Sequence, residues 1–513
     1  MLITSAALIP LVGALLLTVV RGVASRVVAM LASLGSLGIA IAMAVLFNPG
    51  QGMQFTELHQ WIPQIDAYYS LGVDGIGLSL VLLTAILTPL VLLYAFTENF
   101  REDQLGERAF LALALAVEGF SLYVFTATDV LLFYLFFEAT LIPMFFLIGG
   151  FGGAQRRYAA IKFLLYSLTS GLVMLAAVIG VYINSQNSGH GTFLLSDLMN
   201  MNLGTNTERL LFVGFMIAFA VKAPMVPVHT WLPDAAENTT PGGAVMMVAI
   251  MDKIGTFGMF RFALGLFPNA AEWATPVVIV LAVISIIYGA LAALAQGNLM
   301  RLVAYTSVSH FGFIVLGLFA LTPTSVAGAN LYMFNHGIST AALFLLVGYL
   351  MKRRGSAEIA DFGGVQKVAP VLAGFLLIAG LSSLSLPGLA PFVSEFGVLA
   401  GTWTNYPWAA GISAIAMVLA ALYIMRMYKR TMTGLPSDEV KEKVSELSMA
   451  ERWIIVPLLA LLLVLGVYPT PLTRVLNPDS EQAVTFVEKA TNHEAVAPAA
   501  QPESTTISLG GAR

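Results

Sequence analysis

Apolar runs of membrane-spanning length recur along almost the whole chain. A transmembrane helix needs about 20 consecutive, mostly apolar residues. Soluble domains carry about 25% charged residues, whereas only 11% of these 513 residues are charged. The sequence therefore predicts an all-α polytopic membrane protein with about 14 transmembrane helices. The expected spans are 2–20, 27–47, 76–97, 109–127, 129–149, 159–184, 208–226, 243–267, 274–296, 301–322, 327–351, 370–399, 406–430 and 451–470.

Basic residues are distributed unevenly between the connecting segments. Nearly all of them, from Arg21 to Arg452, follow odd-numbered helices, and the segments after even-numbered helices carry essentially Arg209 alone. Because basic loops stay in the cytoplasm, we expect both termini on the non-cytoplasmic side. The first helix lacks a basic leader region and a cleavage site, so we expect it to be retained.

Two predicted helices contain paired prolines. Pro224 and Pro227 follow Lys222 in helix 7, and Pro387 and Pro391 interrupt helix 12. Each proline frees the carbonyl four residues earlier, which at membrane depth must be satisfied by protein or water. Five helices separate the two breaks, and this odd offset predicts inverted repeats with helices 7 and 12 discontinuous. The expected domains are 1–107 (helices 1–3 and an external loop), 108–267 (first repeat, helices 4–8), 268–431 (second repeat, helices 9–13), 432–475 (helix 14) and 476–513 (a C-terminal tail, mainly disordered).

Several ionisable side chains lie inside these apolar helices, where a charge costs about 2.5–3.5 kcal/mol. Such residues usually mark an ion path. The candidates are Glu138, Lys222, Lys253, His310, His336 and Glu395. Structural interpretations stay open at this point: Glu138 could clamp two helices, Lys253 could pair locally with Asp252, and a histidine in an apolar helix is often a packing residue.

Metal and nucleotide sites are not indicated. The chain has no cysteine, so it can hold no thiolate-bound cluster or disulfide. His229 has no second histidine at ligand spacing, and we find neither a P-loop nor a dinucleotide-binding glycine motif. We therefore expect no cofactor and no metal in this chain, and no nucleic acid partner.

Five motifs make the chain recognisable. They read FYLFFEATLIPMFFLIGGFGG, VKAPMVPVHTWLPDA, MDKIGTFGMFRF, RLVAYTSVSHFGFIVLG and FNHGISTAALFLLVG. In this order they closely resemble the antiporter-like, proton-pumping subunits of NADH–quinone oxidoreductase, respiratory complex I, over nearly all of the chain from helix 3 to helix 14. Two of the three large subunit types, L and N, carry lysine at the position of Glu395, and L has a long lateral C-terminal helix. Glu395 and the short C-terminal part favour the third type.

The resemblance implies roles for the candidate residues: an ion pair between Glu138 and Lys222, a central lysine at Lys253, hydrated-axis positions at His310 and His336, and a terminal glutamate at Glu395. One departure follows Pro233 and Asp234. Many relatives have a second histidine there, whereas this chain continues Ala-Ala-Glu, which puts a role for a loop histidine pair in doubt.

The expected function is that of a proton-translocating subunit in the membrane arm of NADH–quinone oxidoreductase, coupled to redox chemistry in other subunits. The expected partners are the neighbouring antiporter-like subunits L and N, the lipid bilayer, protons and water, and the expected location is the bacterial plasma membrane. The alternatives are a subunit of a multi-subunit cation/proton antiporter, a subunit of a membrane-bound hydrogenase or ferredoxin-linked complex, and a stand-alone transporter with broken helices.

Overall fold

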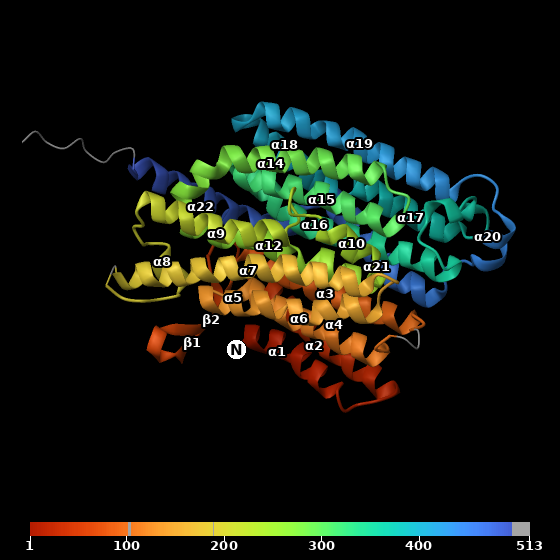
Figure 1. The fold of residues 1–513 in the computed structure, drawn as a ribbon, viewed down its shortest axis with the longest axis horizontal. Coiled ribbons are helices and arrows are strands. Elements are labelled where there is room, and N and C mark those ends of the chain that lie inside the picture. The colour runs from red at the N-terminus through yellow and green to blue at the C-terminus, as the bar shows by residue number, and fades with distance from the viewer. Residues whose placement is uncertain (101–103, 188, 495–513) are drawn as a thin grey trace, which may run out of the picture.

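The computed structural model describes residues 1–100, 104–187 and 189–494, and helices form nearly all of it (Figure 1). Within these ranges, 11 helices are long and apolar enough to cross a membrane, so the prediction of a polytopic helical membrane protein is confirmed. The helices are α1 Leu2–Leu16, α2 Val23–Leu46, α3 Gly75–Thr97, α4 Glu107–Thr126, α5 Val130–Ala139, α6 Leu141–Phe151, α7 Arg156–Asn187, α8 Leu195–Leu198, α9 Thr205–Lys222, α10 Trp231–Glu237, α11 Pro241–Ala244, α12 Lys253–Gly258, α13 Leu264–Leu266, α14 Pro268–Leu294, α15 Leu299–Phe319, α16 Pro323–Arg354, α17 Pro370–Ser383, α18 Ala390–Asn405, α19 Pro407–Met432, α20 Asp438–Lys443, α21 Met449–Val467 and α22 Thr470–Glu494. The 3₁₀ turns are η1 Pro63–Ile65, η4 Ile359–Asp361 and η5 Val365–Lys367, and two π-helical segments are η2 Val245–Met251 and η3 Met259–Ala263.

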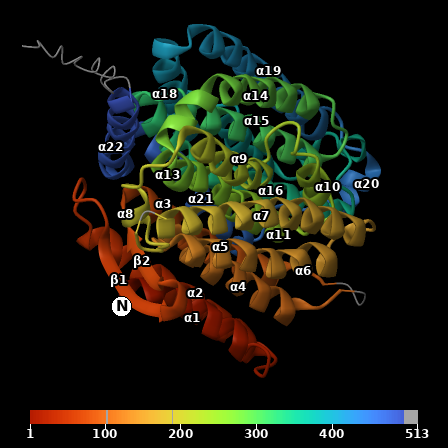
Figure 2. The ribbon, with the colours of Figure 1, turned by 60° about the vertical axis from the view of Figure 1, so that its left-hand side comes forward.

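The long helices lie side by side in one bundle, with α1 and α2 along one edge and α18 and α19 along the opposite edge (Figures 1 and 2). Burial identifies the centre of this bundle. The most apolar stretches of α16 and of the helical segment Pro241–Leu266 are fully buried, whereas fewer than half of the residues in those of α2, α7 and α19 are buried. The exposed helices are apolar, as expected for surfaces that face lipid or other membrane chains.

The expected loop at residues 48–75 contains a β-hairpin. Strand β1 (Gln54–Ile62) pairs antiparallel with β2 (Ala67–Val73), so the all-α prediction has this one exception in the described residues. Both strands are rich in aromatic and apolar residues, which favour extended structure. The buried Glu57 carboxylate fastens the hairpin to the first helix, where it accepts a hydrogen bond from the backbone N–H of Ile3 at 3.0 Å.

The predicted tail is partly wrong, because residues 470–494 form the helix α22. Its apolar residues are spaced along one face and are buried: Leu472, Leu476, Val484 and Val487. An amphipathic helix of this kind contains no continuous apolar run, which is why a search for spanning runs overlooks it. The helix packs against α16, α14 and α3. Residues 495–513 of the expected tail lie outside the described residues.

Both predicted breaks are present. Helix α9 ends at Lys222 and the next helix, α10, begins at Trp231; α17 ends at Ser383 and α18 begins at Ala390. The intervening backbone is satisfied locally, as membrane burial requires. The Ala220 carbonyl, which Pro224 frees, accepts from the Met225 N–H at 3.0 Å.

Candidate functional site

Lys222 occupies the last position of α9 and is buried. Its ammonium donates to the Thr140 hydroxyl at 3.3 Å and lies 4.6 Å from the centre of the Phe137 ring. Thr140 marks the joint between α5 and α6, three residues before Pro143. The break in α9 therefore places a lysine against an interruption in the helix that carries Glu138.

Glu138 lies between these two contact residues on α5. Its carboxylate lies against Gly171 of α7, where a side-chain carbon would come within 1.7 Å of Oε1 and displace the carboxylate. Oε1 accepts no hydrogen bond within the described part of the chain. Glu138 and Lys222 form no direct ion pair, but their charges interact, with Thr140 contacting the lysine between them.

Lys253 begins α12, separated by one residue from the end of the π-helical segment η2. It is completely buried. Its ammonium lies 2.8 Å from the Val248 carbonyl and 2.8 Å from Nδ1 of His336, over the ring of Phe311. The π-helical turn explains the contact with the Val248 carbonyl, because π-helical hydrogen bonding changes which carbonyls accept from the backbone N–H groups. Lys253 thus joins the first half of the bundle to α16.

The two predicted histidines continue from Lys253. The rings of His336 and His310 are 5.2 Å apart and nearly perpendicular, and Nε2 of His336 has no partner among the described residues. His310 in turn lies 5.7 Å from the ring of Tyr332 and interacts with the backbone of Ser383. Pro387 frees the Ser383 carbonyl, because it lacks the N–H that would bond four residues back.

Glu395 ends this run of contacts. It is buried near the start of α18 and accepts from the Tyr332 hydroxyl at 2.9 Å and from the Ser385 hydroxyl. Ser385 lies in the break between α17 and α18 and has a positive φ of 58°. Asn335 of α16 donates to the Ala390 carbonyl at 2.9 Å and so holds the start of α18 in place. The second break therefore positions a carboxylate and one of its donors.

The structure brings four of the six predicted residues, Lys253, His336, His310 and Glu395, into one chain of contacts through Tyr332. Lys222 contacts Thr140 and Phe137 outside this chain, and these two residues flank Glu138 in the sequence. Three further residues take part that the sequence analysis did not select as site residues: Thr140, Tyr332 and Ser385. Tyr332 stands four residues before His336, and this spacing places both on one helix face. That spacing was the available signal for Tyr332.

A second polar cluster lies around α10. Asp234 bridges Lys162 of α7 and Arg301 of α15, each at 2.7 Å, and Arg301 also pairs with Glu237 at 2.8 Å. Asp234 therefore ties α10 to both halves of the chain. His229 is buried between Tyr288 and Tyr305. Among the described residues, no group of three or more His, Asp or Glu side chains could hold a metal ion.

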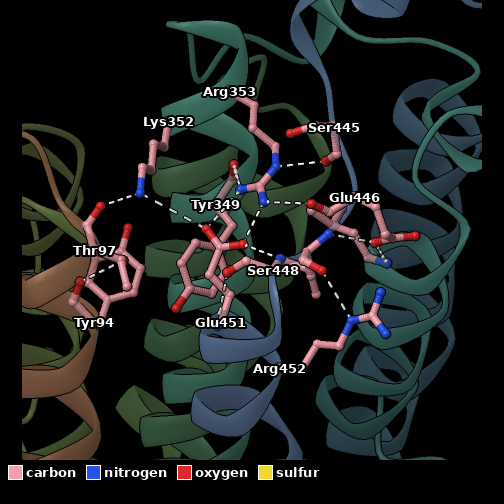
Figure 3. A network of polar contacts seen from close by, with 12 residues as sticks. Tyr94, Thr97, Tyr349, Lys352, Arg353, Ser445, Glu446, Ser448, Glu451 and Arg452 are labelled. Atoms are coloured by element: carbon pink, nitrogen blue, oxygen red, sulfur yellow. Dashed lines mark hydrogen bonds and ion pairs between the residues drawn. The ribbon is translucent and has the colours of Figure 1, made fainter.

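The C-terminal end of α16 carries a third polar network, around Lys352 and Arg353 (Figure 3). Arg353 donates to the Ser445 carbonyl at 2.7 Å and pairs with Glu451 of α21 at 2.6 Å. Glu451 also caps its own helix, because it exchanges hydrogen bonds with Ser448. Lys352 donates to the Thr97 carbonyl of α3. These contacts fasten the end of the central helix to its neighbours on both sides.

Comparison with known proteins identifies the family of this chain. Residues 127–423 match the family model "NADH:quinone oxidoreductase/Mrp antiporter, TM". The chain is 47% identical to NADH-quinone oxidoreductase subunit M of Mycobacterium tuberculosis, over 94% of this chain and 93% of that one. It is 37% identical to subunit M of Rhodobacter capsulatus, over 88% of each.

Solved structures give the same result. A chain of respiratory complex I from Thermus thermophilus superposes with a TM-score of 0.87 at 32% identity, covering 94% of this chain and 99% of that one. A chain of the Mrp complex from Dietzia reaches 0.83 at 19% identity, over 96% and 100%, which shows a shared fold. The chain therefore belongs to the NADH-quinone oxidoreductase subunit M (chain 4) family, the antiporter-like, proton-translocating membrane-arm subunits of respiratory complex I.

Proposed function

We propose that protons cross this subunit along a buried axis that begins at Glu138 and Lys222, passes Lys253, His336 and His310, and ends at Glu395. One observation supports this axis above all: the run of side-chain contacts from Lys253 to Glu395 is unbroken and buried. Each member carries a group that gives or accepts a proton, and an imidazole does both. Apolar side chains would pack this interior at a lower cost in free energy, so packing alone does not explain a buried run of polar groups.

The free energy for proton translocation comes from other subunits of the complex. Members of the family carry no redox centre, so redox energy released in other subunits has to reach the Glu138–Lys222 pair. Two opposite charges buried near each other are only marginally stable, because desolvation offsets much of their attraction. Here Thr140 takes one of the lysine's hydrogen bonds, so a small shift of α5 against α9 changes how strongly Glu138 holds the charge on Lys222.

The proposed frame for this axis is 14 spans with two inverted repeats, 108–267 and 268–431. Both termini lie on the non-cytoplasmic side. Charged clusters at opposite ends support the orientation: Lys162, Asp234 and Arg301 meet at the end where basic loops gather. At the other end Arg261 is neutralised by Asp74, at 2.5 Å.

We infer that the chain lies in a bacterial plasma membrane between the antiporter-like subunits L and N, with lipid on its exposed faces. Its apolar outer helices support this placement, since they leave large side chains uncovered: Leu165, Leu172, Val277, Val418 and Leu422, among others. Copurification tests the assignment. Companion chains with flavin and iron–sulfur domains support the redox complex, whereas companions of an antiporter or a hydrogenase would replace it.

The direct test of the axis is Lys222→Ala in the assembled complex. We expect almost complete loss of NADH-driven proton pumping in membrane vesicles, with normal amounts of assembled complex. Lys443→Ala is the control, because this lysine is exposed on α20 and outside the axis. Normal pumping by the assembled Lys222 variant would exclude the axis.

A further inference from the structure

Asp252 stands at the junction between η2 and α12, immediately before Lys253. Its side chain is completely buried. Its backbone N–H bonds to the Met247 carbonyl, five residues back, at 2.9 Å. The helix is therefore π-wound up to Asp252 and α-wound from Lys253 to Gly258, and such a change of winding is common at functional positions.

The surroundings of Gly255 show which way Asp252 faces. A side-chain carbon at Gly255 would come within 2.5 Å of the Ala223 nitrogen and 2.7 Å of the Phe219 carbonyl, so this helix face packs on the end of α9. Residues three apart in a helix share a face, which directs Asp252 toward the end of α9, where Lys222 stands. The next residue, Lys253, points about 100° away around the helix and reaches His336 on α16.

The carboxylate of Asp252 has no hydrogen-bond partner for either oxygen among the described residues. Its charge interacts with both Lys253 and Lys222. A buried carboxylate without partners is costly, whereas the buried Glu57 and Glu208 carboxylates both accept hydrogen bonds. The vacant oxygens and the position between two lysines indicate a group that takes up and releases a proton.

We propose that Asp252 is the proton carrier between Lys222 and Lys253. This rests on the proposed axis and supplies its missing link, because no hydrogen bond joins the two lysines in the described part of the chain and the run from Lys253 onward is otherwise continuous. In the first step an N–H bond of the Lys222 ammonium breaks and an O–H bond forms on the Asp252 carboxylate, leaving a neutral amine and a carboxylic acid. In the second step that proton moves to the neutral amine of Lys253, which becomes an ammonium as the carboxylate is restored. Water completes either step where the groups do not touch.

The test compares Asp252→Asn, Asp252→Glu and Met251→Leu in the assembled complex, reconstituted in proteoliposomes. Asparagine keeps the shape but carries no proton, so we expect NADH-driven pumping to fall by about 100-fold, within the range for losing a proton-transfer group. Glutamate keeps the carboxyl and should restore most of the rate. Met251→Leu, an apolar exchange at the neighbouring buried position, should pump normally.

The pH profile separates proton transfer from packing. If Asp252 carries the proton, the Glu variant should pump with a shifted pH optimum, because its carboxyl sits on a longer arm. Wild-type pumping by the Asn variant would overturn the proposal, and so would equal losses in the Asn and Glu variants. Lys222→Ala separates the proposal for Asp252 from the proposal for the axis. If Lys222→Ala abolishes pumping while Asp252→Asn does not, the axis stands and only the role of Asp252 is wrong.

Discussion

Replacing Tyr332 with phenylalanine removes one hydroxyl and nothing else from the end of the axis. In the native chain Glu395 is buried and accepts hydrogen bonds from Tyr332 and Ser385. The variant leaves the carboxylate with one of these two donors. A hydrogen bond to a buried charged group contributes about 1.5–3 kcal/mol. If proton transfer through Glu395 limits the rate, this loss corresponds to a roughly 10- to 150-fold slower step.

The assay is NADH-driven acidification of inverted membrane vesicles, with complex assembly measured on native gels. We expect the Tyr332→Phe complex to assemble normally and to pump at about a tenth of the wild-type rate or less. Tyr349→Phe is the matched control, since Tyr349 is equally buried on the same helix and packs beside Tyr94, 5.0 Å away. Equal rates in the Tyr332 variant and the wild type would refute the idea that this hydroxyl supports Glu395 in proton transfer.

Three further predictions concern the first pair, the C-terminal helix and the α16 network. Glu138→Gln should impair pumping strongly because the charge that holds Lys222 is lost, and Glu138→Asp should impair it less. Burial, followed by the charge of Asp74, raises the pKa of Asp479 on α22 to about 7. The folded state therefore holds this proton more tightly than the unfolded state, so docking of α22 should weaken as pH rises from about 4 to about 7, and Asp479→Asn should abolish the dependence. Arg353→Ala removes the closer cationic partner of the buried Glu451 and leaves the more distant Lys352, at 4.0 Å, so it should destabilise the bundle by up to about 3–5 kcal/mol.

Each of these has a direct readout. Proton pumping in fully assembled complexes reports on Glu138, and wild-type pumping by the Gln variant would show that the Glu138 charge does not control Lys222. Amide hydrogen exchange of α22, corrected for the intrinsic rate at each pH, reports on Asp479; protection that is independent of pH in the native chain would contradict the linkage. The temperature at which the complex dissociates on native gels reports on Arg353, and an unchanged temperature would show that the pair does not stabilise the bundle.

The sequence predicts features that depend on the residue types within one segment, such as helix breaks and buried charges. Prolines at 224 and 387 marked the breaks in helices 7 and 12 because a missing N–H has to interrupt helical bonding there. Charge inside apolar runs marked Lys222 and Lys253 for the same kind of reason, since a buried charge is too costly without a role.

Features that depend on tertiary contacts were overlooked. Tyr332 looks like an ordinary core aromatic until Glu395 is seen beneath its hydroxyl. Asp252 reads as a local partner of Lys253 because nothing in the sequence shows the π-wound turn that directs it elsewhere. Helix α22 was assigned to a disordered tail because its apolar residues are spaced, and only packing on α16 and α3 shows that they form one buried face.

The central claim, that protons pass through the buried run from Lys253 to Glu395, is tested most directly by Lys253→Met in the assembled complex. Methionine fills a similar volume next to His336 and carries no proton. We predict that both NADH–quinone turnover and proton translocation in proteoliposomes fall far below wild type while assembly is unchanged. A Lys253→Met complex with wild-type turnover and a wild-type ratio of protons to electrons would contradict the account.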